Sequence, residues 1–222
     1  METIVVAVDG PSGSGKSSTA RGVADRLGWP YLDTGAMYRA LTWAVLEAGA
    51  DLDDAEAVAE AASGVQVVVG TDPAAPAVHA DGTDVSVPIR GPEVTGAVSA
   101  VSAVAEVRER LVAQQRALIA EASDGIVVEG RDIASVVAPE APVKVYLVAD
   151  AAARAARRTA EQGGDSGQVA ATEADLRRRD ALDSGRAASP LAQADGATVV
   201  DTTHLTLDEV VAEIVRMVDA VR

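Results

Sequence analysis

Residues 9–18 read DGPSGSGKSS and follow the apolar run TIVVAV. They fit the pattern G-x-x-x-x-G-K-[ST], with Gly10, Gly15, Lys16 and Ser17 at its fixed positions. Glycines let a loop curl with its N–H groups inward, and the dipole of a following helix favours an anion there. In such a loop Lys16 reaches the β- and γ-phosphates of a nucleotide and the Ser17 hydroxyl binds Mg²⁺. A Gly/Ser turn with a solvated lysine is the alternative, but the β-branched strand in front favours phosphate binding.

Arginine makes up 17 of the 19 basic residues, and lysine occurs only as Lys16 and Lys144. A guanidinium suits forked, bidentate contacts with phosphate oxygens. Residues 151–189 hold seven of these arginines, most of them at helical spacing. Acidic residues are nearly as numerous in that segment, so an ion-paired, solvated helix is the alternative interpretation.

Composition excludes several classes of protein. The net charge of −15 argues against a nucleic-acid partner, because a phosphate backbone is bound chiefly through a basic face. Without cysteine there is no disulfide framework, thiolate metal site or thiol redox chemistry. The chain has no apolar run of about 18 residues and no signal-peptide pattern. We therefore expect a soluble, cytoplasmic protein without membrane contact.

Strands and helices alternate along most of the chain. Short apolar, β-branched runs predict strands within residues 3–10, 29–33, 125–132, 141–150 and 197–201. Apolar residues at helical spacing predict helices within residues 15–27, 34–48, 92–122 (in two pieces, with a break near Ala105 and Glu106) and 206–222. This order predicts an α/β fold with a doubly wound, five-stranded parallel sheet in one domain.

Three local features refine this prediction. Thr34 is expected to cap the helix that follows it. Residues 65–90 alternate β-type runs with Gly, Pro and Asp and include the turn sequence ADGT, which predicts a small antiparallel insertion. The last helix is expected to face inward with Leu207, Val210, Val211, Ile214 and Val218.

Four stretches together resemble the cytidylate kinases, the bacterial CMP/dCMP branch of the nucleoside monophosphate kinases. They are DGPSGSGKSS, YLDTGAMYRA, EGRDIASVVAPEAPVKVYL and RRRDALDSGRAASPL, and the resemblance covers nearly the whole chain. It implies transfer of the ATP γ-phosphoryl group to CMP or dCMP, with Mg²⁺, by a usually monomeric enzyme. It also implies an acceptor-binding region at about 34–105, which contains the β-rich insertion 65–90, and a mobile lid at about 151–189.

The resemblance also assigns roles to individual residues. The ATP phosphates would be held by Gly10, Pro11, Ser12, Gly13, Ser14, Gly15, Lys16, Ser17 and Ser18. The acceptor nucleotide would be held by Thr34, Arg39, Ser99, Arg108, Arg131, Asp132, Arg179, Asp183 and Arg186. Within that set Arg39 and Arg131 contact the phosphate, Asp132, Ser99 and Arg108 read cytosine, and Asp183 and Arg186 hold the ribose hydroxyls and the phosphate. The lid arginines are Arg154, Arg157 and Arg158. The catalytic residues would be Lys16, Arg131, Arg154, Arg158 and Arg186, with Ser17 on the metal.

The chemistry of the proposed reaction agrees with this set. Two anionic groups must be brought together in line, and arginines neutralise their charge without any proton transfer. Cytosine presents an exocyclic amine, for which Asp132 is an acceptor, whereas uracil presents an oxygen. The two histidines, His79 and His204, are expected to be structural or solvated.

Other interpretations remain at this point. A P-loop kinase of UMP or of a shikimate-like acceptor is the main alternative. A GTPase would need an N-K-x-D motif, which the sequence lacks, and a non-catalytic nucleotide sensor could dispense with the lid and acceptor arginines. Asp132 could instead be a helix N-cap, and Arg39 and Arg131 could pair with surface carboxylates.

Overall fold

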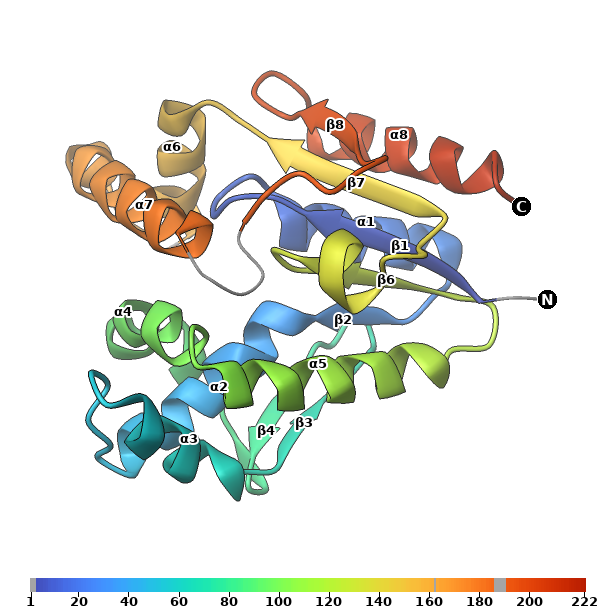
Figure 1. Ribbon diagram of the computed structural model, residues 1–222. Helices are drawn as coiled ribbons and strands as arrows, with labels where there is room; N and C mark the ends of the chain where they lie inside the picture. The colour runs from blue at the N-terminus through green and yellow to red at the C-terminus, as the bar shows by residue number, and fades with distance from the viewer. Residues whose placement is uncertain (1–2, 162, 186–190) are drawn as a thin grey trace.

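A computed structural model describes residues 3–161, 163–185 and 191–222. Its central feature is a five-stranded sheet in which every pairing is parallel, as the sequence predicts. Across the sheet the strands are β2 (Tyr31–Asp33), β6 (Gly125–Glu129), β1 (Ile4–Asp9), β7 (Val143–Val148) and β8 (Thr198–Asp201). Because β1 is the middle strand, the loop that follows it lies at the centre of the sheet edge where all five strands end (Figure 1).

Helices cover both faces of the sheet, which explains why β1 and β6 are apolar up to the carboxylates with which they end, Asp9 and Glu129. One face packs against α1 (Lys16–Leu27) and α8 (Leu207–Asp219), through Val6 and Val8 of β1 and Ile214 of α8. Leu207 is 48% exposed, so the prediction that it faces inward is wrong, whereas Val210, Val211, Ile214 and Val218 are buried as predicted. Leu207 is the first residue of the helix and lies beyond the edge of the sheet's apolar face.

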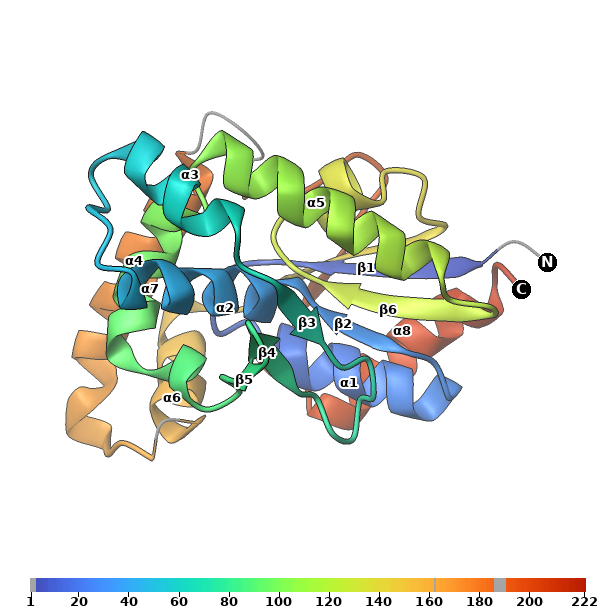
Figure 2. The ribbon, with the colours of Figure 1, turned by 90° about the horizontal axis from the view of Figure 1, so that it is seen from below.

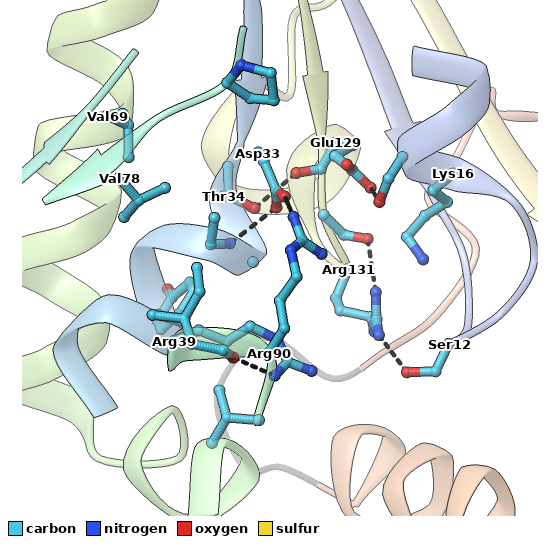
Figure 3. A pocket seen from close by; sticks show the side chains of 18 of the residues that line it. Ser12, Lys16, Asp33, Thr34, Arg39, Val69, Val78, Arg90, Glu129 and Arg131 are labelled. Carbon is cyan, nitrogen blue, oxygen red and sulfur yellow. Dashed lines mark hydrogen bonds and ion pairs between the residues drawn. The ribbon is translucent and has the colours of Figure 1, made fainter. Parts of the chain in front are cut away.

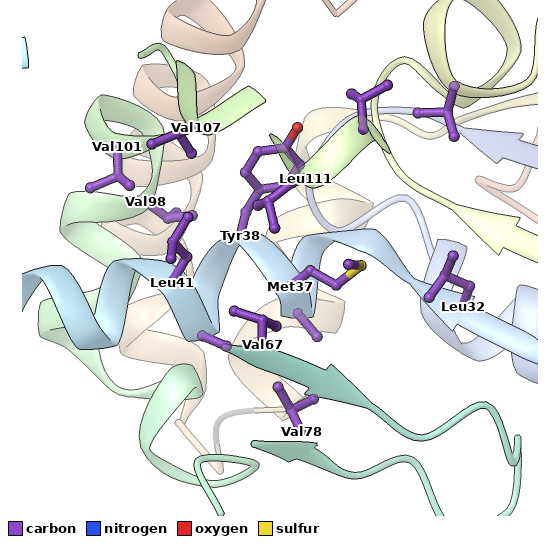
Figure 4. Packing of buried hydrophobic residues seen from close by; sticks show 14 of the residues in the cluster. Leu32, Met37, Tyr38, Leu41, Val67, Val78, Val98, Val101, Val107 and Leu111 are labelled. Carbon is purple, nitrogen blue, oxygen red and sulfur yellow. The ribbon is translucent and has the colours of Figure 1, made fainter. Parts of the chain in front are cut away.

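The other face packs against α2 (Thr34–Glu47) and α5 (Ala105–Ala120) (Figure 2). Met37 and Leu41 of α2 are fully buried, and they lie between Val67 and Val78 on one side and Leu111 on the other (Figure 4). Asp33, rather than Thr34, is the N-cap of α2, because the Asp33 side chain accepts a hydrogen bond from the N–H of Ala36. Thr34 is the first helical residue, which leaves its hydroxyl available for another contact.

The segment between α2 and α5 forms the predicted β-rich insertion and one helix that the sequence analysis did not predict. Its elements are α3 (Ala55–Ser63), β3 (Val67–Val69), β4 (Val78–Ala80), β5 (Thr83–Asp84), η1 (Pro88–Arg90) and α4 (Pro92–Val101). The three strands pair antiparallel. Asp81 and Gly82 both have positive φ, 48° and 77°, and this confirms the hairpin turn predicted from ADGT. The predicted break in the following helical stretch is confirmed and lies between Val101 and Ala105.

The remaining elements follow the carboxyl ends of β6 and β7. A one-turn π-helix, η2 (Ile133–Val137), follows β6, and the charge-rich segment forms α6 (Ala151–Glu161), η3 (Ser166–Gln168) and α7 (Val169–Ser184). Figure 1 shows α6 and α7 beyond the arrowhead of β7. In the part of the chain described here, no helix has the length and apolar character needed to cross a membrane.

Candidate active site

A cavity of about 830 Å³ opens where the parallel strands end. Open α/β sheets bind ligands at this edge. One wall is the loop between β1 and α1, and the opposite wall comes from α2, α4 and the insertion, with residues of α6 and α7 at the rim. Figure 3 shows Ser12 and Lys16 on the first side, Thr34, Arg39 and Val78 on the other, and Glu129 and Arg131 between them. The cavity therefore joins the predicted donor loop to the predicted acceptor residues.

The glycine-rich loop has the shape that phosphate binding requires. Gly10, Gly13 and Gly15 have positive φ, and a Cβ at Gly10 would lie 2.3 Å from the carbonyl oxygen of Leu147. Lys16 is 6% exposed, and its Nζ donates to the carbonyl oxygen of Pro11 at 2.8 Å. Burial, and secondly the charge of Arg131, lower the pKa of Lys16 to about 7. An anion in the cavity would offset both effects, which makes the loop a good receptor for phosphate.

Only part of the predicted phosphate loop faces the cavity. The lining residues are Ser12, Gly13, Gly15, Lys16, Ser17 and Ser18. Gly10, Pro11 and Ser14 are not among them, and Ser14 is fully buried, with its hydroxyl donating to the carbonyl oxygen of Pro11 at 3.0 Å. These three residues support the conformation of the loop on the side away from the cavity.

Glu129, at the end of β6, was missed by the sequence analysis. It is 3% exposed, and it accepts hydrogen bonds from the Ser17 hydroxyl at 3.0 Å and from the Tyr31 hydroxyl. Burial, followed by the charge of Asp33, raises the pKa of Glu129 to about 7. An acidic residue at the end of a buried parallel strand, as in EGRD, is the signal that could have found it.

These oxygens fit a magnesium ion held mainly by substrate. Among the described residues no group of three or more His, Cys, Asp or Glu side chains could hold a metal ion. Mg²⁺ typically takes one or two protein oxygens and completes its shell with phosphates and water. The Ser17 hydroxyl and the Glu129 carboxylate that it contacts lie beside the phosphate loop, and their oxygens fit such a site.

Seven arginines line the same cavity. Four of them, Arg39, Arg131, Arg158 and Arg179, lie close enough to affect one another's charge. Burial lowers the pKa of Arg39 to about 9, with Arg179 and Arg158 as the next causes. Burial and then Arg131 lower the pKa of Arg179 as well. Arg179 is 7% exposed, and its Nε has no hydrogen-bond partner in the part of the chain that the structure describes. Crowded, partly unpaired cations indicate a site for a strongly negative ligand.

The walls fix two of the predicted acceptor residues. Arg39 donates to the carbonyl oxygen of Ile89 and to the hydroxyl of Thr95, both at 2.9 Å, so η1 and α4 orient its guanidinium. Thr34 donates to the carbonyl oxygen of Glu129 at 2.7 Å, which ties the start of α2 to the end of β6. Arg39 therefore pairs with backbone and hydroxyl groups, not with a surface carboxylate.

A polar pocket lies at the acceptor end of the cavity. Arg108 and Asp132 are each 5% exposed and form an ion pair, and the Arg108 guanidinium lies 5.5 Å from the centre of the Tyr38 ring. Ser99 donates to Asp183 at 3.3 Å. Asp132 precedes η2 without making a side-chain cap, so the N-cap interpretation is wrong. Base-sized ligands could meet donors and an acceptor here.

Arg131 connects the two ends of the cavity. Its Nε donates to Asp183 at 3.2 Å, and its Nη2 donates to the Ser12 hydroxyl at 2.6 Å. The predicted alternative, a surface carboxylate partner, does not describe this side chain, because Asp183 is 3% exposed.

The lid arginines differ in position. Arg158 lines the cavity and pairs with Glu161 at 3.2 Å. Arg154 is not part of the lining; it donates to the Ser12 carbonyl oxygen at 3.1 Å and pairs with Asp180 at 2.5 Å. Arg157 donates to the hydroxyl and carbonyl oxygen of Thr202, at 2.9 and 2.5 Å. Arg186 lies outside the described residues.

Comparison with known proteins places the chain in a family. A family model described as cytidylate kinase matches residues 6–220. The cytidylate kinase of Streptomyces griseus is 54% identical over 220 residues, which is 99% of this chain and 94% of that protein. The cytidylate kinase of Nocardia farcinica is 55% identical over 217 residues, 97% of this chain and 93% of that protein. A solved structure of an uncharacterized protein from Eubacterium ventriosum has a TM-score of 0.53 at 12% identity, with 98% of this chain and 99% of that chain covered, a likeness of fold alone. The chain belongs to the cytidylate kinase family.

Proposed function

We propose that this protein transfers the γ-phosphoryl group of ATP to CMP or dCMP, which yields ADP and CDP or dCDP. Family membership supports the reaction class. The observation that carries the assignment of the site is the single cavity that holds the phosphate loop, the arginine cluster and the Arg108–Asp132 pocket. The cavity therefore has adjoining sites for ATP, for the phosphate of the acceptor nucleotide and for its cytosine base.

On the donor side, the loop N–H groups and Lys16 hold the triphosphate. Ser17, with Glu129 behind it, would hold Mg²⁺, which would supply charge neutralisation to the phosphates. The first N–H groups of α1 have no partners within the helix, so they are free to face phosphate oxygens. These groups fix the γ-phosphoryl group and compensate its charge.

On the acceptor side, Arg39, Arg131 and Arg179 hold the nucleotide phosphate against the γ-phosphoryl group. Asp132 accepts from the exocyclic amine of cytosine, while Arg108 and Ser99 donate to the ring nitrogen and the carbonyl oxygen. In this proposal Asp183 binds the ribose hydroxyls, with Arg186 as the second contact that the resemblance implies. The acceptor oxygen is already anionic at neutral pH, so the reaction needs alignment and charge compensation and no general base.

Two parts of the chain close over the substrates in this proposal. Residues of about 34–105 form the acceptor-binding region with the insertion 65–90, and residues of about 151–189 form the lid. Arg154 and Arg158 reach the transferring group when the lid closes. Closure excludes water, which would otherwise accept the γ-phosphoryl group.

The test is release of ADP from MgATP with CMP, dCMP, UMP, AMP or shikimate as the acceptor. We expect fast turnover with CMP and dCMP and poor turnover with UMP. Lys16→Met is the matched control, and it should lower kcat about 10²–10³-fold through loss of charge compensation in the transition state. Equal turnover with shikimate, or no turnover with any nucleotide, would overturn the acceptor assignment.

A further inference from the structure

Helix α7 carries two buried or half-buried carboxylates one turn apart, and each contacts a different substrate site. Asp180 contacts the phosphate loop, and Asp183 contacts the acceptor pocket. Residues three apart on a helix lie on the same face. A single rigid turn of α7 therefore touches both ends of the cavity.

On the donor side, Asp180 is linked to the loop in two ways. It accepts a hydrogen bond from the Ser12 N–H at 3.2 Å and pairs with Arg154 at 2.5 Å, and Arg154 in turn donates to the Ser12 carbonyl oxygen at 3.1 Å. The side chains of Arg154 and Asp180 are 11% and 19% exposed. The loop also touches α6 closely, because a Cβ at Gly13 would lie 3.0 Å from the Arg154 carbonyl oxygen.

On the acceptor side, Asp183 links α7 to the phosphate loop a second time, through Arg131. It accepts from Ser99 at 3.3 Å and from Arg131 at 3.2 Å. Arg131 also donates to the Ser12 hydroxyl at 2.6 Å, a contact that Figure 3 shows. Ser12 is thus joined to α7 directly through Asp180 and indirectly through Arg131 and Asp183. All three polar groups of Ser12, its N–H, carbonyl and hydroxyl, are engaged.

A triphosphate in the loop changes the charge balance at Ser12. Its oxygens attract Arg154 and repel the Asp180 carboxylate, so the direct link is weakened when the donor binds. Because Asp183 lies on the same turn of α7 as Asp180, any adjustment of that turn also moves a contact with the predicted acceptor pocket. A ligand shifts such an equilibrium only through different contacts in the two states, and here both substrates alter contacts of the same turn.

We propose that Asp180 is a positioning residue whose link to Ser12 and Arg154 makes the binding of ATP and the binding of CMP interdependent. Asp180 need not touch either substrate for this. The inference rests on the proposed function, since it requires both nucleotides to bind in the one cavity.

The experiment measures the Kd of CMP with and without a non-hydrolysable ATP analogue and Mg²⁺, by isothermal titration. In the wild-type protein the analogue should change the Kd of CMP at least about fivefold, the lower end of typical coupling between sites. In Asp180→Asn this factor should fall to within about twofold of unity, and the reciprocal effect of CMP on the analogue should fall equally. The control is Glu173→Gln, which changes a half-buried carboxylate on the same helix that pairs with the exposed Arg177, and it should keep the wild-type factor.

Other results would contradict the inference. If Asp180→Asn weakens both ligands but keeps the wild-type factor, Asp180 has only a structural role. If the analogue does not change the Kd of CMP in the wild-type protein, the proposal is also overturned, because the two binding sites are then not coupled. If CMP does not bind the wild-type protein at all, the proposed function fails, and this inference fails with it. Thermal unfolding of each variant shows that the comparison is made on folded protein.

Discussion

At the scale of single residues, the site contains several charges that are buried, and some of them are already paired. Arg108 and Asp132 are the clearest example, since both are nearly inaccessible. A buried ion pair contributes little net stability, because removing two charges from water costs about as much as their attraction returns. In the proposed function, the value of this pair lies in the donor and the acceptor that it presents to a base.

Asp132→Ala should lower kcat/KM more for CMP than for UMP. The loss of one acceptor for a buried donor corresponds to about 1–3 kcal/mol, so the CMP/UMP ratio should fall about 5–150-fold. Measuring both acceptors on one preparation cancels any loss of folded protein. Glu109→Ala, an exposed neighbour of Arg108, should leave the ratio unchanged. Equal losses with both acceptors would refute a base-reading role.

Tyr31→Phe should destabilise the fold. The Tyr31 hydroxyl donates to the buried Glu129 carboxylate, and a hydrogen bond to a charged group contributes about 1.5–3 kcal/mol. Urea unfolding should show a loss of that size in the free energy of unfolding. Tyr146→Phe, on a partly exposed side chain of β7, should cost less than about 1 kcal/mol. Similar losses in the two variants would mean that the contact with Glu129 contributes no particular stability.

At the scale of elements, a carboxylate at the end of β1 fixes the segment that follows β6 at the carboxyl edge of the sheet. Asp9, the last residue of β1, is 3% exposed and accepts from the N–H groups of Ile133 and Ala134 at 2.9 and 2.8 Å. This bond set fixes the start of η2, and hence Arg131 and Asp132 just before it. The phosphate loop and the acceptor contacts therefore share one anchor.

The anchor predicts a pH dependence of stability. Burial raises the pKa of Asp9 from 3.8 to about 6, so the folded protein holds the Asp9 proton more tightly than the unfolded chain. This contribution to stability is complete below about pH 4 and is lost as the pH rises through about 6. Asp9→Asn does not titrate at this position and lacks this gain, so the variant should become about 1 kcal/mol less stable relative to the wild type as the pH falls from 7 to 5. Urea titrations at the two pH values measure this, and a pH-independent difference would show that the Asp9 pKa is not raised.

At the scale of the whole molecule, charge is distributed unevenly. The chain carries a net charge of −15, yet seven of its arginines line the cavity. The overall charge repels other copies of the chain, while the local field attracts nucleotide phosphates. The large apolar side chains most exposed among the described residues are spread over several elements: Val68, Val87, Leu182, Val199, Leu205, Leu207 and Val221.

This distribution predicts a monomer. Sedimentation equilibrium should give a mass near 22.5 kDa at micromolar concentration. The result should hold in low and in high salt, because screening the charge would expose no extended apolar face. A stable mass of twice that value in both conditions would contradict the prediction.

The sequence alone predicted the features that depend on local patterns. The five strands, the phosphate loop and the hairpin at Asp81 and Gly82 follow from runs of β-branched residues and from glycine at positions of positive φ. Helix α3 was not predicted, and Leu207 was placed on the wrong side. Near the end of a helix, periodicity does not say where the partner surface stops.

Only the tertiary structure showed which distant side chains meet. Ser17 and Glu129 are 112 residues apart, and Ser12 and Asp180 are 168 apart, yet each pair is within hydrogen-bond distance. The sequence determined that acidic and basic residues follow buried strands, because parallel strands must end at a common edge. Which of them pair was decided by strand order and by the packing of α6 and α7 against the phosphate loop. Those contacts join elements far apart in the chain, so no local spacing encodes them.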